Sequence, residues 1–207
     1  MRLVNNFCNK LASSTNLTSE QQEIITFGAE SAVSTLYSTG LMLLVSWLLG
    51  IIPTMLYVFI PFAIMKSFAG GSHCKTMTNC AVFSAVTFPG SAKLIECFPA
   101  FFILFEPYIL IFTLILSPLL YYLWAPAQVP EKPISKAYGK KLKTRTFISL
   151  ALIFLVLSIV HVSNFPYAYP LVSAACIGIL MQSLGITPLG YKLMDGIDFI
   201  LSWIFKG

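Results

Sequence analysis

A histidine and two cysteines lie in a polar stretch, GGSHCKTMTNC (residues 70–80), that interrupts an apolar part of the chain. His73 and Cys80 are the pair best suited to catalysis, because a thiol becomes a strong nucleophile once a neighbouring base takes its proton. Residues seven apart on one straight helix lie about 10 Å apart along its axis, whereas proton transfer needs contact within about 3 Å. A Cys–His dyad therefore requires that the backbone between the two residues is not a plain helix.

The residue types around this pair favour such a break. Gly70 and Gly71 fit a loop that carries His73, and they allow a peptide backbone to approach closely. Threonine and asparagine at positions 76–79 are residue types that cap helix N-termini. We therefore expect a new helix to start near Cys80, with a dipole that favours the thiolate.

Two alternatives compete with the dyad. A zinc site from His73, Cys74 and Cys80 is the weaker one, because no fourth ligand lies nearby and the spacing matches no familiar zinc motif. The other is a polar loop with incidental cysteines. We interpret Cys74 as a small neutral neighbour of the pair, and His161, which lies near the end of a separate apolar segment, as structural.

Membrane-spanning helices must position these residues. The chain has 207 residues, of which 57% are hydrophobic and 10% charged, whereas soluble domains carry about 25% charged residues. Residues 31–65, 107–130 and 146–191 contain no Asp, Glu, Lys or Arg, and a crossing helix needs roughly 20 residues. The runs are continuous rather than alternating, which argues against a barrel. We predict one all-α, polytopic integral membrane domain over residues 1–207.

The apolar pattern predicts about six crossings and two interfacial helices, one near the N-terminus and one at 191–206. We expect Pro89-Gly90 to break the third, weakest segment, and residues 125–145 to form a loop. By the positive-inside rule the Lys140–Arg145 cluster is cytoplasmic, and of the 13 Lys and Arg residues only Lys93 then falls on the other side. The expected crossings are 19–50, 54–66, 81–94, 99–124, 146–162 and 171–184.

Several ionisable residues lie apart from the polar stretch. Glu106 falls inside an apolar segment, where ionisable groups are functional candidates, and Lys93 and Glu96 are spaced to pair with each other. A small transporter with Glu106 in its substrate path is therefore the alternative function. The basic cluster either attracts an acidic peptide and anionic lipid or only sets the topology.

The stretch KSFAGGSHCKTMTNC, placed after the second apolar segment, resembles the signature of the accessory gene regulator B (AgrB) family. These proteins are membrane-embedded cysteine peptidases of Gram-positive quorum sensing. Six apolar segments, the PAQVPEKPI segment before a basic cluster and a length near 200 agree with the family. The resemblance implies that Cys80 is the nucleophile and His73 its partner. Lys66 stands where the family usually has arginine, which keeps the charge but loses bidentate carboxylate binding.

The resemblance also implies a reaction and its partners. The substrate is an AgrD-like propeptide whose acidic C-terminal tail is removed through a Cys thioester, after which a thiolactone or lactone ring closes. It further implies a homodimer in the bacterial plasma membrane. The charge bias independently predicts that the polar stretch, and with it the active site, faces the cytoplasm, with membrane lipid as a further partner. No cofactor, metal or nucleic acid is expected. The expected substrate-binding residues are Gly70, Gly71, Lys66, Lys140, Lys141, Lys143 and Arg145.

Overall fold

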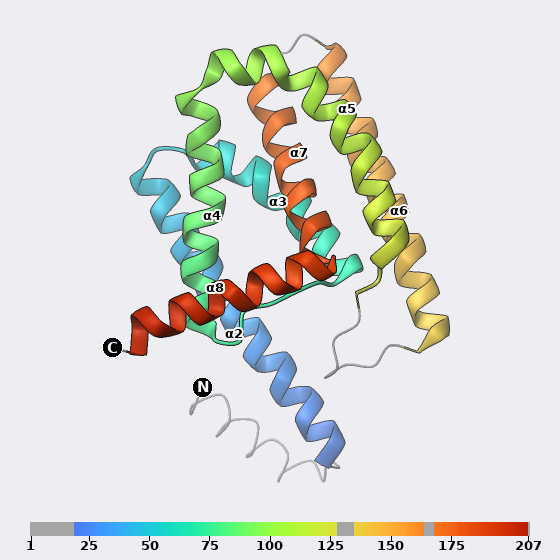
Figure 1. The fold of residues 1–207 in the computed structure, drawn as a ribbon. Coiled ribbons are helices and arrows are strands. Elements are labelled where there is room, and N and C mark those ends of the chain that lie inside the picture. Colours follow the sequence, from blue (N-terminus) through green and yellow to red (C-terminus); the bar gives the residue numbers. More distant parts are fainter. Residues whose placement is uncertain (1–18, 128–134, 164–167, 207) are drawn as a thin grey trace.

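The chain is an all-α bundle with one helix lying across its end (Figure 1). The computed structural model describes residues 19–127, 135–163 and 168–206, and these residues form helices and no strand. The predicted all-α class is confirmed, whereas the predicted N-terminal interfacial helix lies outside the described residues. The helices are α2 (Ser19–Leu48), α3 (Ile52–Ala69), α4 (Met77–Cys97), α5 (Pro99–Trp124), α6 (Lys136–Val162), α7 (Ala168–Gly185) and α8 (Pro188–Lys206).

Five of the described helices are long and apolar enough to cross a membrane, which confirms the polytopic membrane class. They are α2 over Gly28–Leu48, α3, α5, α6 and α7. Helix α4, with 21 residues, has the length of about 30 Å that a crossing needs. It carries Lys93 and Glu96, however, and is not among the five. The layout with six crossings stays a prediction.

Helix α4 corrects the expected break at Pro89-Gly90. The helix runs without interruption from Met77 to Cys97, with Pro89 inside it. Pro89 is buried, and the neighbouring Phe88 makes edge-to-face contacts with Phe59 and Phe62 of α3. A proline removes one helical hydrogen bond, but in an apolar environment a continuous helix still satisfies more backbone groups than a break would.

The basic segment is a second correction, because it is helical rather than part of a loop. Helix α6 starts at Lys136, ten residues before the predicted position 146, and Ser135 caps it by accepting a hydrogen bond from the Tyr138 N–H at 3.3 Å. The cluster from Lys140 to Arg145 therefore forms the first turns of a long helix whose later part can cross the membrane.

Helix α7 is the centre of the bundle. Ten of its 18 residues are buried, and it packs mainly on α3 and α5. Gly178 lies so close to α3 that a Cβ there would overlap the Val58 carbonyl, in keeping with the small residues that let helices approach in membranes. The outer helices instead expose large apolar side chains, as Phe101, Leu104 and Ile115 do on α5.

Helix α8 crosses the end of the bundle at which α3 ends and α4 and α6 begin (Figure 1). It confirms a C-terminal helix that begins three residues before the predicted position 191. The helix is amphipathic, since Phe199 and Trp203 are exposed whereas Asp198 is buried. Its polar side therefore faces the segment between α3 and α4.

Candidate active site

The segment between α3 and α4, residues 70–76, carries His73. The Gly70 N–H closes α3 by donating to the Lys66 carbonyl at 3.0 Å, and the chain then turns at Gly70 (φ 72°) and Gly71 (φ 128°). Both φ values lie in the region that favours glycine. A Cβ on Gly71 would also lie 3.3 Å from the Gly185 carbonyl oxygen. The predicted glycine loop is therefore observed, and it depends on both glycines.

Helix α7 holds this loop from one side. The Gln182 side chain donates from Nε2 to the Gly70 carbonyl at 2.6 Å. Ser72 donates twice to the Gly185 carbonyl, from its backbone N–H at 3.1 Å and from its hydroxyl at 3.0 Å. The residue directly before His73 is thus fixed to the end of the most buried helix.

Lys66 holds the loop from the α3 side. Its ammonium group donates to the Ser72 carbonyl at 2.9 Å and lies 5.5 Å from the centre of the Phe62 ring. Hydrogen bonds from a charged donor are about twice as strong as neutral ones. The lysine expected to contact substrate is therefore also bonded to the protein's own backbone.

Helix α4 begins at Met77, as expected from the threonine and asparagine residues there. The Thr76 hydroxyl oxygen accepts a hydrogen bond from the Asn79 N–H at 3.1 Å, which is an N-terminal cap. Cys80 lies in the first turn, ahead of the segment 81–94 that was expected to cross the membrane. The backbone between His73 and Cys80 is consequently a loop followed by a helix start, which meets the condition set for a dyad.

His73 and Cys80 both line one cavity of about 580 Å³. This volume falls in the range of about 300–1,000 Å³ that is common for ligand sites. Apolar side chains from α3 and α4, including Phe62, Phe83 and Phe88, form much of its wall, and Lys66 lies at the same cavity. His73 is exposed and Cys80 half-buried. The cavity therefore joins a solvent-accessible base, a partly shielded thiol and a cation.

The surroundings of Cys80 favour its thiolate. A hydrogen bond from the Cys74 thiol lowers the pKa of the Cys80 thiol, burial opposes this effect, and the Lys66 charge adds to the lowering. The same hydrogen bond and burial raise the pKa of Cys74. The Cys74 thiol also lies 3.5 Å from the Met194 sulfur, but a thiolate is a better acceptor than a thioether. Cys74 thus acts as a neutral donor beside the nucleophile candidate.

The zinc alternative finds no support. Within the described ranges, no group of three or more His, Cys, Asp or Glu side chains is arranged to hold a metal ion. His73, Cys74 and Cys80 are all described residues, so they do not form such a ligand set.

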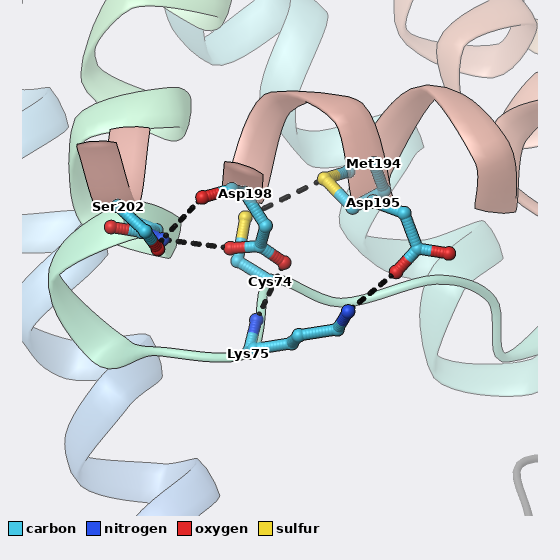
Figure 2. A network of polar contacts seen from close by, with 7 residues as sticks. Cys74, Lys75, Met194, Asp195, Asp198 and Ser202 are labelled. Atoms are coloured by element: carbon cyan, nitrogen blue, oxygen red, sulfur yellow. Dashed lines mark hydrogen bonds and ion pairs between the residues drawn. The ribbon is translucent and has the colours of Figure 1, made fainter. Parts of the chain in front are cut away.

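Helix α8 supplies polar groups that the sequence patterns did not indicate (Figure 2). Asp198 accepts hydrogen bonds from the Lys75 N–H at 2.8 Å and from the Asn79 amide at 2.9 Å. Asp195 pairs with the Lys75 ammonium group at 3.0 Å. These are the only two aspartates in the chain, and they lie three apart on an amphipathic helix. That spacing was a usable signal that one helix face turns toward a polar partner.

The basic cluster lies at the same end of the bundle as the loop but does not line the cavity (Figure 1). Lys140, Lys141 and Arg145 are exposed, whereas Lys143 donates to the Tyr122 carbonyl at 2.7 Å and lies over the Tyr122 ring. The fold brings Lys66, His73 and Cys80 together and leaves this cluster as a separate surface.

Glu106, the residue that suggested a transporter, has a partner. Its carboxylate is buried and lies 2.8 Å from the His161 Nδ1 atom. The pair joins the first half of α5 to the end of α6, and neither residue lines the cavity. His161 therefore has a partner on another helix, and this helix-joining contact agrees with its predicted structural role.

Glu96 accepts a hydrogen bond from Thr54 at 2.7 Å, and the ion pairs found among the described residues do not join it to Lys93.

Comparisons with known proteins agree on one family. The sequence profile described as accessory gene regulator B, AgrB, matches residues 4–186. A protein of Clostridium perfringens (strain 13 / Type A), described by its name as AgrB-like, is 22% identical over 198 residues, which cover 91% of this chain and 92% of that protein. No solved structure matches the chain.

Proposed function

The chain belongs to the accessory gene regulator B family, whose members take part in the processing of quorum-sensing peptides, and on this premise we propose that it is a membrane-embedded cysteine endopeptidase. Its substrate is an AgrD-like propeptide, from which it removes an acidic C-terminal tail. The observation that carries the proposal is the shared cavity of His73 and Cys80 at the start of α4. Thiol-based acyl transfer needs a partly shielded thiol and a base within one site, and the shared cavity supports this assignment.

The first half of the reaction cleaves the peptide bond before the tail. His73 takes the Cys80 proton, and the thiolate attacks the carbonyl carbon at the junction between the central part of the propeptide and its tail. Hydroxyl groups of Ser38 and Ser84 line the same cavity and stabilise the Cys80 thiolate, and they can donate to the oxyanion once the sulfur has lost its charge in the attack. When the carbon–nitrogen bond breaks, the imidazolium returns its proton to the leaving amine. The tail departs, and a thioester to Cys80 remains.

The second half closes the ring. A thiol or hydroxyl of the propeptide gives its proton to His73 and attacks the thioester carbonyl. The bond to Cys80 breaks, and the released thiolate recovers a proton from the imidazolium. Water competes with this attack, and the aromatic wall formed by Phe62, Phe83 and Phe88 supports the exclusion of water from the acyl-enzyme.

The site faces the cytoplasm, because the basic start of α6 lies at the same end of the bundle and positively charged residues next to a crossing stay inside. Lys140, Lys141, Lys143 and Arg145 attract the acidic tail and anionic lipid. Lys66 carries positive charge to the cavity, and Gly70 and Gly71 shape the loop that the substrate meets. The active unit is a homodimer, to be tested by mass measurement in nanodiscs.

The test is tail removal from the cognate propeptide in the membrane, read by mass spectrometry. Wild-type protein should release the tail, whereas Cys80→Ala and His73→Ala should abolish release at equal membrane abundance. Cys97→Ala is the matched cysteine control, because Cys97 is exposed and lies at the other end of α4. Substantial tail removal by Cys80→Ala would contradict the mechanism.

A further inference from the structure

Asp198 is the described residue of α8 whose side chain is both charged and buried, with 3% of its surface exposed. Its two carboxylate oxygens have different partners. Oδ2 accepts from the backbone N–H of Lys75 at 2.8 Å, and Oδ1 accepts from the side-chain amide of Asn79 at 2.9 Å. Burial of a carboxylate is costly unless it is hydrogen-bonded. These two hydrogen bonds therefore explain how a carboxylate is tolerated in this buried position.

The two partners of Asp198 belong to the two sides of the candidate dyad. Lys75 lies two residues after His73 in the loop, and Asn79 lies directly before Cys80 in the first turn of α4. A single carboxylate therefore joins the segment that carries the base to the helix that carries the nucleophile (Figure 2). Ser202, one turn further along α8, also accepts a hydrogen bond from the Asn79 amide, at 3.1 Å.

Two further contacts fix α8 to the same loop. Asp195 pairs with the Lys75 ammonium group at 3.0 Å, and the Cys74 thiol lies 3.5 Å from the Met194 sulfur. The Lys75–Asp195 pair is largely exposed, with 72% and 65% of the two side chains accessible, and exposed pairs contribute little to stability. Asp198 is consequently the contact by which α8 can set the geometry of the loop.

We propose that Asp198 is a positioning residue of the peptidase site. It holds the His73 loop and the first turn of α4 at the separation that proton transfer from Cys80 requires. This inference rests on the proposed function, because it assumes that the two residues act together. It extends beyond the family profile, which ends at residue 186, whereas α8 begins at Pro188. The C-terminal helix is thereby part of the catalytic unit rather than only a membrane-surface helix.

The test uses an exchange of side chains between the two bonded residues. Asp198→Asn places an amide donor against the Asn79 amide donor. A flip of Asn79 would relieve this clash but would turn its oxygen toward the Asp198 backbone carbonyl, to which its Nδ2 donates at 3.4 Å. Asn79→Asp places a carboxylate against a carboxylate, so each single variant loses a bond. The double variant Asn79→Asp/Asp198→Asn restores both, because the new amide oxygen accepts from the Lys75 N–H and the new amide N–H donates to position 79. Asp195→Asn is the matched control on the same helix.

The first readout needs no substrate. Alkylation of Cys80 by iodoacetamide in the full-length, membrane-reconstituted protein is followed peptide by peptide with mass spectrometry. Misplacement by about 1 Å can cost about 100-fold in rate. We expect Asp198→Asn to slow alkylation of Cys80 at least tenfold, the double variant to recover most of the rate, and Asp195→Asn to stay near wild type. In a His73→Ala background the Asp198→Asn change should not lower the alkylation rate of Cys80 any further. If the change acted through a general loss of structure, it would alter the rate in this background as well.

The second readout is tail removal, in which Asp198→Asn should lower kcat with little change in KM. The inference would be overturned if Asp198→Asn showed wild-type rates of alkylation and cleavage. It would also be overturned if the double variant were as heat-stable as wild type but did not recover these rates. If wild-type protein cleaves no propeptide but Cys80 alkylation still depends on His73 and Asp198, the positioning role stands and the proposed substrate fails.

Discussion

The ammonium group of Lys66 donates a hydrogen bond to the carbonyl oxygen of Ser72, 2.9 Å away, and so joins the end of α3 to the residue before His73. The same charge lowers the pKa of Cys80. Lys66 therefore acts on both members of the candidate dyad, on one through the backbone and on the other through its field. The lysine makes one hydrogen bond to this carbonyl, whereas an arginine would offer a forked donor.

Lys66→Met should lower the rate of tail removal much more than Lys66→Arg. Methionine fills similar space but leaves the Ser72 carbonyl without its charged donor, a loss worth about 1.5–3 kcal/mol, and it removes the cation near Cys80. Arginine keeps both the charge and a donor. Cleavage rates at matched membrane abundance check this prediction, and equal rates for Lys66→Met and wild type would contradict it.

The pH dependence of Cys80 should change when Cys74 is replaced. Because the Cys74 hydrogen bond lowers the pKa of Cys80, the reactive thiolate persists to lower pH than in a free cysteine, whose pKa is about 8.5. Alkylation should fall as the pH drops through this lowered pKa. Cys74→Ala removes the donor, so the midpoint should move to higher pH, while tail removal at pH 8 is mostly retained. An unchanged midpoint would show that the Cys74 hydrogen bond is absent.

Gly71→Ala should abolish most tail removal. A Cβ at this position meets the Gly185 carbonyl and the Ile186 side chain, each at 3.3 Å, and the backbone has φ 128°. Strained conformations of this kind cost about 1–3 kcal/mol, and the loop can relieve the strain by shifting His73. Gly90→Ala is the control, because a Cβ there meets nothing within 4 Å inside α4. Cleavage and thermal unfolding are measured for both, and a full-rate Gly71→Ala protein would show that the loop tolerates displacement.

Glu106→Gln separates the peptidase from the transporter alternative. Glutamine keeps the shape and can still bond His161, so the contact between α5 and α6 survives in neutral form. Because neither residue lines the cavity, tail removal should stay within about twofold of wild type. A transporter with Glu106 in its substrate path predicts the opposite result, namely lost function in Glu106→Gln and retained function in Cys80→Ala.

Replacing two exposed lysines of the basic cluster should weaken substrate binding rather than chemistry. Lys140→Gln/Lys141→Gln removes charge that attracts an acidic tail, so KM should rise at low salt while kcat stays constant, and the difference should shrink as salt screens the field. Lys93→Gln, an exposed change on the side predicted to be external, is the control. If both variants raised KM equally, the cluster would serve only to set the membrane topology.

Local patterns predicted much of the fold because they depend on neighbours in the chain. The apolar runs indicated helices α2, α3, α5, α6 and α7 to within a few residues at many ends, and the cap-forming residues at 76–79 indicated the start of α4. Two predictions were wrong, the break at Pro89-Gly90 and the loop over the basic cluster, because contacts of the neighbouring residues outweighed the local sequence pattern. The packing of Phe88 and the burial of Pro89 accompany an unbroken α4, and Ser135 starts α6 before the basic cluster.

The sequence alone determined that this is an all-α membrane chain, and that a histidine and a cysteine seven residues apart need a loop and a helix start between them. Only the tertiary structure decided what holds that loop. Gln182, Gly185 and Asp198 lie more than 100 residues along the chain from the groups they bond. The spacing of the two aspartates could indicate a polar face on α8, but no pattern in a single sequence identifies hydrogen-bond partners over such separations, because these bonds form only after the helices have packed.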